Sequence, residues 1–144
     1  MKGDRVPDQH HIARYCQPKY IADEQIQPGA FMLRPTDESL SVNWLEFLNC
    51  LNRENEIAEL RKIYSKKLRV GARAKTVVLN VGEVREKVRT ESSDVRNLKV
   101  LHDPEYTEAY DDESHSGIYN LRNDDELIAE LILETIQEVY FARK

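Results

Sequence analysis

The sequence predicts a single small α+β domain with a mixed or mainly antiparallel sheet, a helical pair in the middle and a long C-terminal helix. Three observations favour this class. The 144 residues fit the usual size of one domain. No linker or internal repeat divides them. Strand-like and helix-like segments follow one another without the regular alternation of a parallel α/β fold. Residues 1–9, which are mostly polar, are expected to form an N-terminal arm, and residues 10–144 the domain.

Three strands are expected in the first third of the chain. The first covers residues 11–16 and ends before Pro18, because proline lacks the N–H that a strand ladder needs. A turn signal at residues 27–29 precedes a second strand over 30–34. Residues 40–42 alternate in polarity and are expected to pair with that second strand.

Two helices are expected in the middle of the chain. Over residues 43–51, apolar side chains recur at the spacing of one helical face, and Asn43 can accept a hydrogen bond from a free N–H of the first turn. Near residues 54–68, acidic side chains come first and basic side chains last, which complements the helix dipole. The two apolar faces are Trp44, Phe47, Leu48 and Leu51, and Ile57, Leu60, Tyr64 and Leu68.

The second half opens with the clearest strand, residues 76–81. Its β-branched, nearly continuous apolar run is typical of a strand buried on both faces. Val84 and Val88 then indicate one or two helical turns. The remaining elements before the C-terminal helix are strands over 98–101 and 117–121, separated by an acidic loop over 103–113.

The last element is predicted to be a long helix over residues 124–142, capped by Asn123. Its apolar positions cover an arc that is wide for a helix with a single buried face. We therefore expect a second covering surface, either the rest of the domain or another chain. For contact with another chain, the predicted interface residues are Ile128, Ile132, Ile136 and Val139.

The net charge of −5 conceals a polarised distribution. Residues 61–100 carry 12 bases and 4 acids, whereas residues 101–144 carry 3 bases and 12 acids. Such asymmetry indicates either that the acidic end folds back near the basic middle, or that the basic region 61–100 faces a nucleic acid or an acidic partner. The basic side chains proposed for binding are Lys66, Lys67, Arg69, Arg73 and Lys75.

Several function classes lack their motifs. The chain has no G-x-S-x-G elbow, no G-x-x-x-x-G-K loop and no C-x-x-C pair. No apolar run is long enough for a membrane span, and the first residues do not resemble a secretory signal, so a cytoplasmic location is expected. The histidines and carboxylates around residues 102–115 match no zinc or EF-hand spacing. We expect neither a cofactor nor a metal.

Candidate catalytic residues come from two segments. Arg14 offers a fork of donors that suits phosphate, and His11 and His115 can transfer protons near neutral pH. Since strand residues two apart share a face, His11 and Arg14 are expected on opposite faces of their strand. Only convergence of these side chains in space would make them one site.

Three functions follow from these observations. The first is a small interaction or regulatory module that self-associates or assembles with a larger protein partner. The second is a small enzyme that acts on a phosphate-bearing or nucleotide-like substrate through Arg14 and a histidine. The third is nucleic-acid binding through the basic region 61–100.

Overall fold

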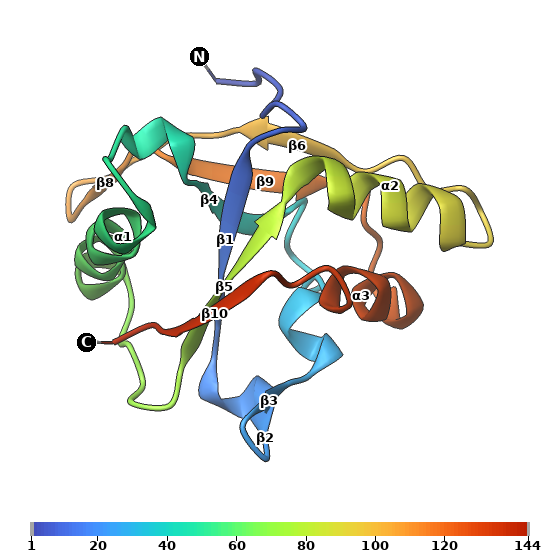
Figure 1. The fold of residues 1–144 in the computed structure, drawn as a ribbon, viewed down its shortest axis with the longest axis horizontal. Coiled ribbons are helices and arrows are strands. Elements are labelled where there is room, and N and C mark those ends of the chain that lie inside the picture. The colour runs from blue at the N-terminus through green and yellow to red at the C-terminus, as the bar shows by residue number, and fades with distance from the viewer. Residues whose placement is uncertain (1, 144) are drawn as a thin grey trace.

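A computed structural model describes residues 2–143 as one α+β domain built on a six-stranded antiparallel sheet (Figure 1). The strand order is β10-β5-β1-β4-β9-β6, and every neighbouring pair is antiparallel. This confirms the predicted class. The strands are β1 (His11–Cys16), β4 (Leu40–Trp44), β5 (Lys75–Asn80), β6 (Lys99–His102), β9 (His115–Tyr119) and β10 (Glu138–Phe141).

Helices cover both faces of the sheet. Figure 1 shows α1 (Arg53–Lys67) on one side and α2 (Val81–Glu91) with α3 (Glu126–Leu133) on the other. The sheet has a hydrophobic core on each face, and β5 contributes side chains to both. Val77 and Leu79 pack with α2 and α3, whereas Val78 packs with Leu60 of α1. All three β5 side chains are fully buried, which confirms that this strand is covered on both faces.

Short elements complete the chain. They are the hairpins β2 (Ile21–Ala22) with β3 (Gln25–Ile26) and β7 (Glu105–Tyr106) with β8 (Asp111–Asp112), and the 3₁₀ turns η1 (Pro18–Tyr20), η2 (Pro28–Phe31) and η3 (Glu46–Leu48).

The two edges of the sheet are occupied to different extents. Along β6, the N-terminal residues add backbone hydrogen bonds from Gly3 N to His102 O and from Val6 N to Val100 O, and the Val6 side chain is buried. At β10, the outward carbonyl of Phe141 accepts hydrogen bonds from Arg61 Nε and Nη2, at 3.2 and 3.0 Å. Free edges invite pairing with another chain. Here the N-terminal segment occupies the edge at β6, and Arg61 occupies one carbonyl of the edge at β10.

The helix predicted over residues 43–51 is wrong. β4 continues through Trp44, with Ala13 opposite Asn43 and Ile12 opposite Trp44, and only the short turn η3 follows. The apolar spacing of this segment is satisfied by strand pairing plus one tight turn, because tertiary contacts outweigh a local helical pattern. The helix that does form, α1, is capped by Asn52, whose side chain accepts a hydrogen bond from Asn55 N.

The C-terminal helix is shorter than predicted. α3 ends at Leu133, and β10 occupies residues that the sequence assigned to the helix. The chain turns where Thr135 Oγ1 donates to Ile132 O, after which Gln137 N donates to Val78 O and starts the pairing with β5. The β-branched and aromatic run from Val139 to Phe141 suits this strand.

Two other predicted elements also change. Residues 30–34 form no strand. Pro28 begins the turn η2, which ends at Phe31 and places the Phe31 side chain in the core. The one or two turns expected after Gly82 are the eleven-residue helix α2, which Asn80 caps through a hydrogen bond from Glu83 N.

Candidate functional site

A cavity of about 410 Å³ opens beside the middle of the sheet. β1 and β4 pair at only two positions and separate beyond Ala13, so that side chains rather than backbone hydrogen bonds fill the space between them. The end of α1 and the β7–β8 hairpin close the other sides. The volume falls in the range of small-molecule sites. The lining residues that matter below are Arg14, Ser41, Lys67, Glu105 and His115.

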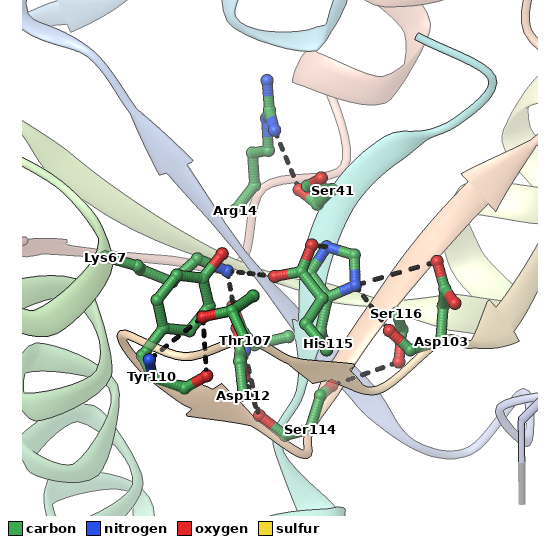
Figure 2. A network of polar contacts seen from close by, with 12 residues as sticks. Arg14, Ser41, Lys67, Asp103, Thr107, Tyr110, Asp112, Ser114, His115 and Ser116 are labelled. Atoms are coloured by element: carbon green, nitrogen blue, oxygen red, sulfur yellow. Dashed lines mark hydrogen bonds and ion pairs between the residues drawn. The ribbon is translucent and has the colours of Figure 1, made fainter.

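Arg14 places a positive charge in the wall of this cavity. Its Nε donates to Ala30 O at 2.9 Å and its Nη1 to Ser41 O at 2.8 Å (Figure 2). Within residues 2–143 it makes no ion pair. Burial lowers the pKa of the Arg14 guanidinium, yet arginine starts so high that the group stays charged. The bonds to carbonyls fix this cation and leave its charge uncompensated.

His115 faces the same cavity from β9. Its Nδ1 lies 2.7 Å from Asp103 O, and because a carbonyl only accepts, Nδ1 must carry the hydrogen. In the neutral ring, Nε2 therefore presents a lone pair. Nε2 is buried and has no hydrogen-bond partner among the described residues, and Glu105 Oε2 lies 3.7 Å away. Such an unsatisfied buried nitrogen is uncommon and requires a reason.

A buried carboxylate holds the hairpin against α1. Asp112 is inaccessible to solvent; its Oδ2 accepts from Lys67 Nζ at 2.8 Å and its Oδ1 from Asn43 Nδ2 at 2.8 Å (Figure 2). Lys67 also donates to Glu105 Oε1 at 2.7 Å. Burial alone would lower the pKa of Lys67, but the hydrogen bonds to Asp112 and Glu105 outweigh burial and raise it. Lys67 is therefore a fixed, paired cation.

Two of the three predicted catalytic residues meet at this cavity and one does not. Arg14 and His115 both line it. Figure 2 shows Arg14 reaching toward Ser41 and away from the His115 ring. His11 lies outside the cavity lining, on the opposite face of β1 from Arg14, where Glu46 accepts hydrogen bonds from its backbone N and from Nδ1, each at 2.7 Å.

The predicted basic binding residues separate into different environments. Lys67 and Arg69 line the cavity, whereas Lys66 and Arg73 are exposed at the surface. Lys75 lies over the Phe141 ring, 3.4 Å from its centre. Gly71 runs close to Pro18 at the cavity wall, where an added Cβ would lie 2.6 Å from Pro18 Cγ. The segment after α1 therefore packs against the cavity, but its basic side chains do not form one continuous site.

The predicted interface residues also separate. Ile128 and Ile132 are buried in the core beside β5, at 6% and 0% exposure. Ile136 packs against that core, and only Val139, at 51% exposure, lies at the surface. As placed, they do not form one exposed stripe.

Sequence reasoning missed Glu105, Asp112 and Asn43 as parts of the site. Asp112 and Asn43 are 69 positions apart and meet only through the β4–β9 pairing, in which Asn43 lies opposite His115. The one available signal is the concentration of histidine and carboxylates around residues 102–115, a segment that the sequence predicts to contain an acidic loop. Within residues 2–143, no group of three or more His, Cys, Asp or Glu side chains is placed to hold a metal ion.

The chain matches no protein-family model, no curated protein and no solved structure. In the described part of the chain, no helix is long and apolar enough to cross a membrane.

Proposed function

We propose that the protein binds a small phosphate-bearing or nucleotide-like ligand in the cavity between β1 and β4. The observation that carries this proposal is that Arg14, a cation without an ion pair in residues 2–143, and His115, with an unpartnered nitrogen, line the same cavity. A guanidinium is well suited to a phosphate because it offers several donors in a fixed plane.

The balance of charge and shape supports an anionic ligand with a ring. Arg34 pairs with Asp37, and Lys67 pairs with Glu105 and Asp112, which leaves Arg14 and Arg69 as the cations without an ion pair among the described lining residues. Aromatic walls accompany these charges and can contact a nucleobase or another flat ring. They are the side chains of Tyr15, Tyr20, Tyr64 and Tyr110.

The surface of the molecule favours ligand binding over self-association and over nucleic-acid binding. Self-association through a sheet edge would have to displace the N-terminal segment or Arg61. Lys66 and Arg73 lie outside the cavity lining, so a nucleic acid bound to them would not use the tyrosines of the cavity. Both remain predictions. We also propose a cytoplasmic location, which the two free cysteines support.

Isothermal titration with adenosine monophosphate and with inorganic phosphate tests the proposal. The wild-type protein should bind the nucleotide, and R14Q should weaken binding by roughly 10- to 100-fold, because a hydrogen bond to a charged group contributes about 1.5–3 kcal/mol. R122Q is the matched control, since Arg122 is exposed outside the cavity lining. Thermal unfolding verifies that each variant is folded. Equal affinity in R14Q and wild type, or no binding of either anion by the wild type, would overturn the proposal.

A further inference from the structure

We infer that the cavity is a phosphodiesterase site in which His115 is the general base for attack of water on a phosphate diester. This inference rests on the proposed phosphate-binding function and adds a reaction to it. Its independent observation is that His115 lines the cavity and that its Nε2, which is buried, has no hydrogen-bond partner in residues 2–143.

The surroundings of His115 prepare Nε2 to accept a proton. The Asp103 carbonyl fixes the hydrogen on Nδ1, which leaves the lone pair on Nε2. When the ring takes a second proton, the Asp103 carboxylate, whose Oδ2 lies 4.0 Å from Nδ1, stabilises the positive charge. Glu105 Oε2, 3.7 Å from Nε2, lies where the water and the diester must bind. A histidine held by a carbonyl on one nitrogen and free on the other has the arrangement that general-base catalysis requires.

The charges favour a diester over a monoester. Four cations line the cavity, Arg14, Arg34, Lys67 and Arg69, and three acids oppose them, Asp37 and Glu105 in the wall and Asp112 behind Lys67. The difference of one positive charge matches the single negative charge of a phosphate diester. A monoester carries close to two negative charges at neutral pH and would leave one uncompensated beside Glu105.

The reaction balances as a hydrolysis. Nε2 of His115 removes one proton from water while the water oxygen forms a bond to phosphorus, and Arg14 stabilises the negative charge that accumulates on the phosphoryl oxygens. The phosphorus–oxygen bond on the side opposite the attacking water breaks, the leaving oxygen takes a proton from the solvent, and Nε2 gives its proton back to the solvent. One water and one diester give one alcohol and one phosphate monoester. Because Nε2 is buried, the diester and its water must displace the Glu105 side chain, which is one-third exposed.

Hydrolysis of bis(p-nitrophenyl) phosphate, followed by release of nitrophenolate, tests the inference. Nitrophenolate leaves without taking a proton, so this reaction needs no general acid. Its rate therefore reports on the general base, His115. H115N keeps an amide donor for the Asp103 carbonyl but lacks the Nε2 base, and it should lose about 100- to 10,000-fold in kcat with little change in KM. H11N is the matched control, because His11 is held by Glu46 outside the cavity lining and should keep wild-type turnover.

The pH profile provides a second readout. Wild-type kcat/KM should fall as the pH is lowered, because a protonated His115 cannot accept a proton from water, and any residual H115N activity should lack this limb. Binding of adenosine monophosphate without diester turnover by the wild type would overturn the inference and leave the binding function standing. Absence of both would overturn the binding function. Turnover by H115N at the wild-type rate would also overturn the role of His115.

Discussion

At the scale of single residues, the site depends on groups whose charges are fixed by neighbours from distant parts of the chain. Asp112 is fully buried, and it is tolerated there because Lys67, Asn43 and Ser114 all contact its oxygens. A buried carboxylate with partners costs little, whereas one that loses its cation becomes strongly unfavourable. Lys67 thus joins the hairpin to α1.

Replacing Lys67 by methionine should lower the free energy of unfolding by about 3 kcal/mol or more, because it leaves the Asp112 charge buried without its cation. Urea unfolding measures the change. K66M is the control: Lys66 is the exposed neighbour, and its loss should change stability by less than about 0.5 kcal/mol. If K67M and K66M unfold alike, the pair does not hold the hairpin.

The sequence could predict which residues of the candidate site carry useful chemistry, but it could not predict that they line the same cavity. The guanidinium of Arg14 and the imidazole of His115 were identified from their chemistry alone. His11 has the same chemistry, but it lies on the opposite face of β1 from Arg14 and is held by Glu46 instead. Because successive side chains of a strand point to opposite faces, the sequence predicted that His11 and Arg14 would lie on opposite faces of the sheet. Nothing in the spacing could show that β9 brings His115 to the cavity lined by Arg14.

At the scale of elements, the pattern of apolar residues predicted most of the strands and α1. It predicted a helix wrongly where the segment pairs with a neighbouring strand instead. Trp44, Phe47 and Leu48 have the spacing of a helix, yet Trp44 completes β4 and donates from Nε1 to His10 Nδ1. Val139 to Phe141 extends a helical arc in the sequence, but β5 offers an open edge that a strand can cover. The wide apolar arc of the predicted helix is thus explained by two elements, a short helix and a strand.

Arg61 should keep β10 from pairing with other chains, because its guanidinium occupies the outward carbonyl of Phe141 beside the exposed Val139 and Phe141 side chains. R61A should therefore self-associate more strongly than the wild type as protein concentration rises, measured by sedimentation velocity. K62A is the control, because Lys62 pairs with Glu59 on the helix surface. Identical sedimentation of R61A and wild type at all concentrations would show that Arg61 does not protect this edge.

At the scale of the whole molecule, much of the charge asymmetry is internal. Lys67, Lys87 and Arg96 of the basic middle pair with Asp112, Glu134 and Asp125 of the acidic end, so the predicted folding-back of that end is seen in ion pairs. The exposed cations Lys66, Arg69 and Arg73 lie outside these pairs. The polarity of the sequence therefore serves partly to close the fold, and the remaining basic side chains stay exposed, with Arg69 among them in the cavity lining.

Stability should decrease as the solution is acidified. Hydrogen bonds from Arg34 and Arg96 lower the pKa values of Asp37 and Asp94. Burial would raise the pKa of Glu46, but hydrogen bonds from His11 outweigh burial and lower it. A carboxyl whose folded pKa is depressed stabilises fully above its unfolded pKa and loses this contribution as the pH falls through the folded value.

Urea unfolding at a series of pH values below neutrality should show this decline. E46Q should decline less steeply than the wild type, because its side chain does not titrate. E108Q is the control, because Glu108 is exposed on the β7–β8 hairpin, and it should decline like the wild type. If E46Q and the wild type have the same slope, the His11–Glu46 pair makes no contribution to acid sensitivity.

The position of β10 has a consequence for synthesis on the ribosome. β5 lies between β1 and β10, so its outer edge is covered only by residues 138–141, which follow the other five strands of the sheet along the chain. Until then, the apolar Val77–Leu79 stretch presents an unpaired edge, the feature through which nascent chains aggregate. The nascent protein therefore passes through a period in which the other five strands can pair but one edge of β5 is still open, and the emergence of β10 closes it.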